Sequence, residues 1–286
     1  MDKAIEKARL LVEALPYIKQ FHGKTMVIKY GGSTITNGNV EKNFITDIVL
    51  MKYVGMNPVI VHGGGPLITE ALKETGKRSR FVDGLRVTDK ESIDIVSKIL
   101  SRVNEEIVSL IKEVGGEAIG LSNIVKAKKY PSLNREGKEV DMGSVGKVES
   151  ISPELPALVA KKEAIPVINP LGRESEGEAL NVNADEVAAR IAVELRAEKF
   201  FILTDVPGIM RDWEDKESLI STLTIAGAKS LMKEEVIIRG MIPKVKACIK
   251  ALQGGVKKIH IVDGRVSHSI LLEIFTDKGI GTQMVK

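Results

Sequence analysis

The chain has 286 residues, of which 42 are lysine or arginine and 38 are aspartate or glutamate, so its formal net charge is +4. The charges are interspersed, so no basic stripe indicates a nucleic-acid partner and no acidic tail indicates disorder. The single cysteine, Cys248, excludes an internal disulfide, and the four histidines are too scattered for a Cys/His metal cluster. The length suffices for one large α/β domain or two lobes with a sizeable core.

The N-terminal segment mixes charged residues with apolar ones, which excludes the apolar core of a signal peptide. No later run is long and uncharged enough to span a membrane. The use of only one cysteine favours a reducing compartment. We therefore expect a cytoplasmic protein with no membrane partner, no nucleic-acid partner and no metal held by its own side chains.

Residues 3–15 have apolar side chains at spacings of three and four, which predicts an amphipathic helix that Pro16 stops or kinks. This helix precedes the first predicted strand and is not needed as a crossover between strands. Its apolar face must pack either on its own domain or on a second subunit, and the sequence leaves both open.

The stretch Thr25–Tyr30 is a short apolar run with β-favouring side chains, which predicts a buried strand that ends at Gly31 and Gly32. Glycines at the end of a strand let the backbone approach a ligand, and their N–H groups can point at an anion. Lys29 lies inside this strand, where a cation needs either the edge of the sheet or an acidic partner. Taken alone, Lys-x-Gly-Gly fits a purely structural strand end as well as it fits an anion-binding turn.

A second predicted strand, residues 57–62, runs into the glycines 63–65, and a helix is predicted over residues 67–75. This order places backbone N–H groups at a helix N-terminus, where they bind anions. A tight strand-to-helix turn is the simpler interpretation. A tight turn does not require three consecutive glycines, so we favour the interpretation that a ligand approaches the backbone here.

Arg86 lies in a β-like run, on the face opposite its apolar neighbours. Thr88 and Glu91 predict a capping box for a helix that continues to about Val114. Residues 117–148 alternate short β-like runs with turns, which predicts hairpins that cover one side of a lobe.

The polar loop at residues 172–178 is the candidate boundary between two lobes. Beyond it, the motif LNVNAD places Asn181, Asn183 and Asp185 at alternate positions before a predicted helix. One short polar side chain suffices to cap a helix, so the other two suggest a function.

The rest of the chain continues the alternation, with a strand at residues 199–204 that ends at Asp205 and Gly208. We expect a helix over residues 268–275 and an edge strand at residues 279–284. Strands that alternate with helices throughout predict an α/β fold with a mainly parallel sheet and helices on both faces.

Ligands of such sheets bind at the carboxyl ends of the strands, where Lys29, the glycines 63–65 and Asp205 fall. The sequence has no G-x-G-x-x-G after a strand and no P-loop, and no Ser/His or Cys/His arrangement provides a nucleophile. The chemical features that remain at this edge of the sheet are backbone amides and positive charge. Phosphoryl transfer requires both, because its transition state spreads negative charge over oxygens.

Several motifs occur in an order and spacing that resembles the N-acetylglutamate kinases of the amino acid kinase superfamily. They are KYGG (29–32), HGGGP (62–66), GLRVTD (84–89), NVNAD (181–185), LTDVPGI (203–209), GMIPK (240–244) and HIVDGR (260–265). The resemblance covers residues 26–284, and the ordered set is far more specific than any one motif. It implies an αβα sandwich and ATP-dependent phosphorylation of the side-chain carboxylate of N-acetyl-L-glutamate in arginine biosynthesis.

The resemblance also implies roles for individual residues. Lys29 and Lys244 would stabilise the transition state, and Asp185 would hold both lysines in place. The substrate-binding set would be Gly64, Gly65, Arg86 and Asn181, with Arg86 on the α-carboxylate. ATP, with Mg²⁺ on its phosphates, would bind the lobe after Asn181, and the ATP-binding set would be Gly31, Gly32, Asp205 and Gly208.

The resemblance further implies an oligomer and a regulator. Residues 1–22 would be an N-terminal oligomerisation helix, 23–178 the lobe for acetylglutamate and dimerisation, and 179–286 the ATP lobe. Arginine-sensitive members resemble this chain in having an extra N-terminal helix that interlaces dimers into a hexamer. Feedback inhibition by L-arginine is implied, with a site made by Tyr17, His268, Glu273 and Gly279 in a homohexamer that is a trimer of dimers.

The chain departs from the family pattern in two places. Ser33, Thr34 and Ile35 stand where Asn-Ala-Met is common, and Arg239 stands where a second glycine is common. Neither departure removes a catalytic group. Two alternatives stay open: a sister kinase of N-acetyl-aminoadipate, because one methylene is worth only about 1–3 kcal/mol, and a non-catalytic module that senses arginine or a nucleotide.

Overall fold

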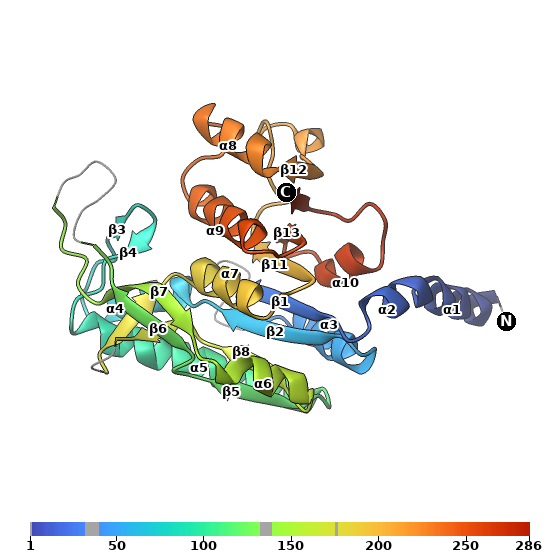
Figure 1. Cartoon of the computed structure of the whole chain (residues 1–286), viewed down its shortest axis with the longest axis horizontal. Coiled ribbons are helices and arrows are strands. Elements are labelled where there is room, and N and C mark those ends of the chain that lie inside the picture. Colours follow the sequence, from blue (N-terminus) through green and yellow to red (C-terminus); the bar gives the residue numbers. More distant parts are fainter. Residues whose placement is uncertain (1, 32–39, 132–138, 175–176) are drawn as a thin grey trace.

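A computed structural model describes residues 2–31, 40–131, 139–174 and 177–286 and shows a layered α/β body with a helical arm at one end (Figure 1). In these residues the central sheet has eight strands in the order β12–β14–β13–β11–β1–β2–β8–β5. The strands are β1 (Thr25–Tyr30), β2 (Asn57–His62), β5 (Ala118–Leu121), β8 (Ile165–Ile168), β11 (Lys199–Thr204), β12 (Thr222–Thr224), β13 (Lys258–Asp263) and β14 (Thr282–Val285). Neighbouring strands are parallel except β13 and β14, which confirms the predicted mainly parallel sheet.

Helices cover both faces of this sheet, as the alternation of strands and helices predicts. One face carries α6 (Glu154–Lys161), α7 (Ala184–Glu194), α8 (Ile225–Lys233) and α9 (Met241–Gln253). The other face carries α2 (Leu15–Phe21), α3 (Lys42–Tyr53), α4 (Gly65–Glu74), α5 (Ser92–Glu113) and α10 (Ser269–Ile274). Side chains alternate along each strand, so Val27 of β1 joins the core under α7 while Met26 and Ile28 join the opposite core.

A second, smaller sheet lies beside the central one. It closes into a barrel of β6 (Val125–Lys129), β7 (Val145–Ile151), β9 (Leu171–Arg173) and β10 (Ala179–Val182). The antiparallel β6–β7 pair confirms part of the predicted hairpin region, whereas β5 joins the central sheet as an edge strand. The loop proposed as the lobe boundary connects β9 to β10, and β10 pairs back onto β9 and β7. The division into lobes stays a prediction.

The N-terminal segment forms two helices, α1 (Asp2–Glu13) and α2, with Pro16 in the first turn of α2, as expected of a proline that interrupts a helix. Phe21 at the end of α2 is buried in the core. By contrast, α1 extends away from the body (Figure 1), and Leu10, Leu11 and Val12 are 61%, 75% and 67% exposed. No helix among the described residues is long and apolar enough to cross a membrane.

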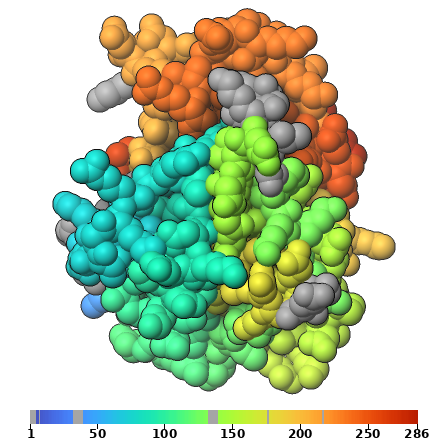
Figure 2. Space-filling model, turned by 90° about the vertical axis from the view of Figure 1, so that its left-hand side faces the viewer, coloured from blue at the N-terminus to red at the C-terminus, as the bar shows by residue number. Residues whose placement is uncertain are grey.

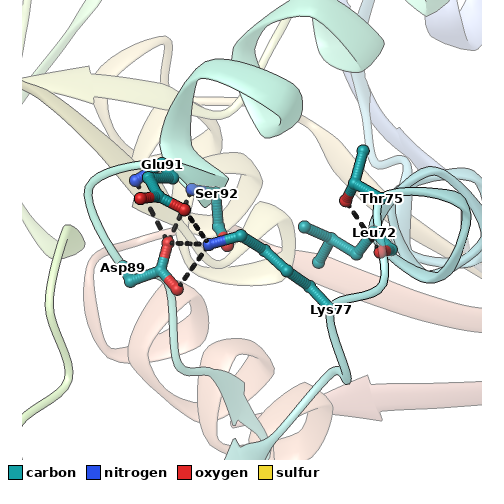
Figure 3. A network of polar contacts seen from close by, with 6 residues as sticks. All are labelled: Leu72, Thr75, Lys77, Asp89, Glu91 and Ser92. Atoms are coloured by element: carbon teal, nitrogen blue, oxygen red, sulfur yellow. Dashed lines mark hydrogen bonds and ion pairs between the residues drawn. The ribbon is translucent and has the colours of Figure 1, made fainter.

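Two local predictions are wrong. The strand at the C-terminus, β14, is not an edge strand, because β12 pairs with its outer side. Thr88 and Glu91 do not form a capping box: Asp89 accepts hydrogen bonds from the N–H groups of Glu91 and Ser92 instead, at 3.1 and 2.7 Å (Figure 3). Lys77 binds the same carboxylate at 3.0 Å, and the Ser92 N–H and this lysine lower the pKa of Asp89 to about 2.

Two smaller elements complete the described structure. A hairpin of β3 (Phe81–Val82) and β4 (Leu85–Arg86) precedes α5, and a short 3₁₀ turn spans Lys216–Ser218. Figure 2 shows the end of the molecule that carries this hairpin (cyan), with the C-terminal part of the chain (orange) above it. The two parts lie close together. A Cβ built on Gly84 would lie 3.3 Å from Cγ of Pro243, at the start of α9.

Candidate active site

Lys29, Asp185 and Lys244 meet at the carboxyl end of β1. Lys29 comes from the strand itself, and alternation along β1 turns its side chain to the face that α7 and α9 cover. Nζ of Lys29 lies 3.2 Å from Oδ1 of Asp185, and Nζ of Lys244 lies 3.0 Å from Oδ2. The three residues that the sequence predicts as catalytic therefore form one buried cluster, although they are far apart in the chain.

The start of α7 explains how Asp185 is placed. Asn183 caps the helix, since its side-chain oxygen accepts from the N–H groups of Asp185 and Glu186. Asp185 then lies in the first helical turn, where the helix dipole favours a carboxylate. Of the three polar residues in LNVNAD, one caps the helix and the other two are free for other roles, as the sequence predicts.

The charges of the cluster follow from burial and from the mutual contacts. Burial, helped by Lys244 and opposed by Asp185, lowers the pKa of Lys29 to about 8. Burial raises the pKa of Asp185, but the two lysines outweigh it and hold that pKa below its ordinary value. Burial lowers the pKa of Lys244, but Asp185 outweighs it and the pKa is raised. With both lysines protonated, the cluster carries one net positive charge.

The cluster borders a pocket of about 200 Å³ that also contains the predicted substrate-binding residues. Its walls include Lys29, Gly64, Gly65, Arg86, Asn181 and Asp185. Apolar side chains such as Ile68 and Leu100 complete the lining. The structure thus brings all four residues of the predicted substrate set to one place, next to two members of the lysine–aspartate cluster.

Arg86 is held at the pocket wall by neutral partners. Its guanidinium donates to the Gly65 carbonyl at 2.9 Å and to Thr69 Oγ1 at 2.7 Å, and also bonds Ser79. It lies over the ring of Phe81, 4.7 Å from the centroid. None of these partners is acidic, so its charge is available to an anionic ligand. Sequence reasoning missed Thr69, Ser79 and Phe81, because these three partners lie outside every recognised motif.

The two glycine turns touch through their backbones. Gly31 has φ +141°, and a Cβ there would lie 2.7 Å from N of Gly63, so only glycine fits. The Gly63 N–H donates to the Tyr30 carbonyl at 2.7 Å and fastens the turns together. A Cβ on Gly65 would meet no atom within 4 Å, so the glycine there leaves open space at the pocket. Gly32 and residues 33–35 lie outside the described residues.

Asn181 is oriented by a residue that the sequence suggested for another role. Its Nδ2 donates to Thr88 Oγ1 at 3.0 Å, and Thr88 in turn donates to the Arg86 carbonyl at 2.9 Å. Thr88 therefore links the two predicted substrate-binding residues rather than capping α5. Its place in GLRVTD was the one available signal.

The described members of the predicted ATP set, Gly31, Asp205 and Gly208, follow the carboxyl ends of β1 and β11, outside the substrate pocket. Asp205 follows β11 directly, and its charge contributes to the raised pKa of Lys244. Gly208 has φ +158°, and a Cβ there would lie 2.6 Å from Thr282 Oγ1, so packing alone accounts for this glycine. The described residues contain no group of three or more His, Cys, Asp or Glu side chains that could hold a metal ion.

A second pocket, of about 640 Å³, contains three of the four residues predicted to bind arginine. Tyr17, Glu273 and Gly279 line it together with Lys199 and His260. His268 does not: its Nδ1 lies 2.6 Å from Oδ1 of Asp47 of α3, and it lines a different pocket. His268 is the N-cap of α10 and Glu273 lies five residues further on, about 140° around the helix, so the two side chains point in different directions.

The protein-family model described as "Amino acid kinase family" matches residues 24–263 of this chain. The acetylglutamate kinases of Pelotomaculum thermopropionicum and Desulforamulus reducens are 54% and 51% identical to this chain, over 100% of it and 100% and 99% of their own lengths.

Solved structures agree on the fold. N-acetylglutamate synthase from Neisseria gonorrhoeae, complexed with coenzyme A and N-acetyl-glutamate, has a TM-score of 0.84 at 27% identity; the match covers 98% of this chain but 63% of the synthase. Carbamate kinase from Giardia lamblia bound to AMP-PNP has a TM-score of 0.66 at 15% identity, over 92% of this chain and 99% of that chain, and shares the fold. With a family model over most of its length and relatives that are about half identical along all of it, the chain belongs to the amino acid kinase family and is a kinase.

Proposed function

We propose that the chain transfers the γ-phosphoryl group of ATP to the side-chain carboxylate of N-acetyl-L-glutamate, giving N-acetyl-L-glutamyl 5-phosphate for arginine biosynthesis. The observation that carries the proposal is the pocket that Arg86, Lys29 and Asp185 line together, with Lys244 paired to Asp185 beside it. Such a pocket suits a ligand with two carboxylates. The relatives named acetylglutamate kinase support this choice of substrate.

The chemistry needs little from the protein beyond charge and position. A carboxylic acid with a pKa near 4 is ionised at neutral pH, so the attacking carboxylate needs no general base. The obstacle is repulsion between this anion and the ATP phosphates. A cation about 4 Å from an anion, at an effective dielectric near 20, contributes on the order of 4 kcal/mol, so two lysines are a sufficient catalytic device.

Each remaining residue of the pocket has a binding role in this proposal. Arg86 binds the α-carboxylate of the substrate, because its fork matches two oxygens. Gly64 and Gly65 provide backbone N–H groups from the first turn of α4, which have no partner within the helix. Asn181 binds the substrate with its side-chain amide. Asp185 does not react: it keeps the two lysines charged and in place.

ATP binds the C-terminal lobe, residues 179–286, in this proposal, with Mg²⁺ on its phosphates. Gly31, Asp205 and Gly208 lie at the carboxyl ends of β1 and β11, the edge where ligands of parallel sheets bind. Asp205 acts electrostatically on Lys244, which connects this edge to the catalytic cluster. The fourth residue of the set, Gly32, lies outside the described residues.

L-Arginine inhibition is the regulatory part of the proposal. Tyr17 of α2 lines the same pocket as Glu273 and Gly279, so a ligand there contacts the N-terminal segment directly. The exposed apolar side chains of α1 then pack against a second copy of the chain in a homohexamer, a trimer of dimers. His268, which lies apart from the pocket, acts only indirectly in this proposal.

A coupled assay of ADP release over a panel of acceptors tests the proposed reaction. The panel contains N-acetyl-L-glutamate, N-acetyl-aminoadipate, N-acetyl-aspartate and free glutamate. We expect the highest kcat/KM with N-acetyl-L-glutamate. A preference for N-acetyl-aminoadipate would identify the sister kinase instead, and nucleotide or arginine binding without turnover of any acceptor would identify a sensing module.

A further inference from the structure

Two buried polar residues, His62 and Asn104, lie behind the glycine turn of the pocket. His62 is the last residue of β2, and Asn104 is in the middle of α5. We propose that they are positioning residues: they fix the backbone of Gly63 so that the N–H groups of Gly64 and Gly65 face the acceptor substrate. The identity of that substrate rests on the proposed function, whereas the positioning rests on the hydrogen bonds of the two side chains.

Two backbone carbonyls determine how these side chains are oriented. Nδ2 of Asn104 lies 3.0 Å from the Val167 carbonyl, which can only accept, so the amide nitrogen must point there. The same Nδ2 lies 3.1 Å from Nε2 of His62 and donates its other hydrogen to it. Nδ1 of His62 lies 3.0 Å from the Gly63 carbonyl and must therefore carry the proton. The chain of donors runs in one direction, from Asn104 to His62 to Gly63.

As a result, both backbone groups of Gly63 are occupied. Its carbonyl accepts from His62, and its N–H donates to the Tyr30 carbonyl at 2.7 Å. The peptide plane that follows Gly63 is thus fixed, and this plane carries the N–H of Gly64. Gly64 is the N-cap of α4, so the orientation of this plane also sets where the helix begins.

Burial keeps the ring of His62 neutral. Burial lowers the pKa of His62 to about 4, opposed only by the Gly63 carbonyl, and no charged group among the described residues acts on it. His62 therefore adds no titrating charge beside Lys29 and Arg86. A neutral ring with one donor and one acceptor is what the chain of hydrogen bonds requires.

Gly120 of β5 makes room for Asn104. A Cβ on Gly120 would collide with Oδ1 of Asn104, so this strand position must be glycine for the amide to keep its place. Gly120 is not among the residues that line the substrate pocket. It therefore offers a way to displace Asn104 without touching the pocket.

Steady-state kinetics of Asn104→Leu and Gly120→Ala test the proposal in the full chain. We expect each variant to raise KM for N-acetyl-L-glutamate by about tenfold or more, since small displacements of binding groups are costly, and to leave KM for ATP within about twofold. Ile107→Ala is the matched control, because Ile107 is buried on the same helix but packs in the apolar core. It should lower Tm and leave both KM values unchanged. An Asn104→Leu or Gly120→Ala enzyme that behaves like Ile107→Ala would overturn the proposal.

A pair of substitutions at His62 provides a second test. Asn places its amide nitrogen near the position of ring Nδ1, so His62→Asn can still donate to Gly63. Gln reaches the position of Nε2, so His62→Gln can contact Asn104 but not Gly63. We expect KM for the acceptor to rise about tenfold more in His62→Gln than in His62→Asn. Equal KM values in the two variants would contradict the proposal.

Backbone hydrogen exchange separates this proposal from the proposed function. If the wild-type chain turns over no acceptor in the panel, the proposed function fails, but the positioning can still be measured. We expect faster amide exchange over residues 62–67 in Asn104→Leu than in Ile107→Ala, with each variant measured at the same interval below its own Tm. Exchange at equal rates in the two variants would show that Asn104 does not hold the turn.

Discussion

Nζ of Lys244 lies 3.0 Å from Oδ2 of Asp185, which joins the first turn of α9 to the first turn of α7. The other oxygen of the same carboxylate faces Lys29 of β1 at 3.2 Å. One acid thus holds a lysine from the sheet and a lysine from a C-terminal helix. Asp185 therefore links the two lysines, and neither half of the chain holds the complete cluster.

Removal of the lysine of β1 tests the role of the cluster. Lys29→Ala should lower kcat by at least about a hundredfold, the scale for loss of one transition-state stabiliser. Lys250→Ala is a matched control, because Lys250 lies on α9 with a side chain that is 63% exposed and pairs only loosely with Glu186. The control should retain wild-type kcat. Near-normal turnover by Lys29→Ala would refute its assigned role.

The pH dependence of wild-type activity follows from the pKa of Lys29. Lys29 acts as a cation, and its pKa is lowered to about 8, so kcat/KM should fall as the pH rises through about 8. A bound anion favours the charged amine, so kcat should fall at a higher pH than kcat/KM. A kcat/KM that stays constant to about pH 9.5 would contradict this assignment.

The same shift has the opposite effect on stability. Between about pH 8 and the unfolded lysine pKa of about 10.4, the unfolded chain binds more protons at this site than the folded chain. The contribution of Lys29 to the free energy of unfolding therefore rises with pH in this window. The titration of Lys29 should therefore not lower Tm over this pH range. A loss of activity without a fall in Tm would show that unfolding is not its cause.

Arg86 should determine affinity for the acceptor rather than for ATP. Arg86→Lys keeps the charge but loses the fork that bonds Gly65 and Thr69 and the stacking on Phe81. We expect KM for N-acetyl-L-glutamate to rise at least about tenfold, with KM for ATP little changed. Arg102→Lys, on an exposed position of α5, serves as the control. Equal changes in both KM values would argue against a specific contact with the acceptor.

Deletion of residues 1–20 should separate the proposed oligomer from the catalytic body. The deletion removes α1 and most of α2, including Tyr17. We expect a dimer by light scattering that retains kinase activity and is far less sensitive to L-arginine. Leu11→Glu, on the exposed face of α1, should also disrupt the larger assembly while leaving Tyr17 intact. Unchanged mass and unchanged inhibition after the deletion would contradict the proposal.

The sequence predicted those features of the site that arise from local order along the chain. A strand that ends in glycines placed Lys29 and Gly31, and the strand-to-helix turn placed Gly64 and Gly65. The two polar residues beyond the one that caps α7 pointed to Asn181 and Asp185. Each of these follows from the geometry of a single element, which residue spacing determines.

Contacts between distant elements could not be predicted in this way. The partners of Arg86 come from α4 and from the segment before β3, and Thr88 reaches Asn181 only because the small barrel packs against it. His268, the N-cap of α10, faces α3, whereas Glu273 inside the same helix faces the large pocket. Such relationships arise from tertiary packing, on which spacing along the chain gives no information.

Trapping of the product with hydroxylamine tests the central claim most directly, because hydroxylamine converts an acyl phosphate into a hydroxamate. The chain is incubated with ATP, Mg²⁺, hydroxylamine and N-acetyl-L-glutamate. We predict equal amounts of ADP and hydroxamate, both dependent on the acceptor and both at least about a hundredfold lower with Lys29→Ala. Release of ADP without hydroxamate would contradict phosphorylation of the carboxylate.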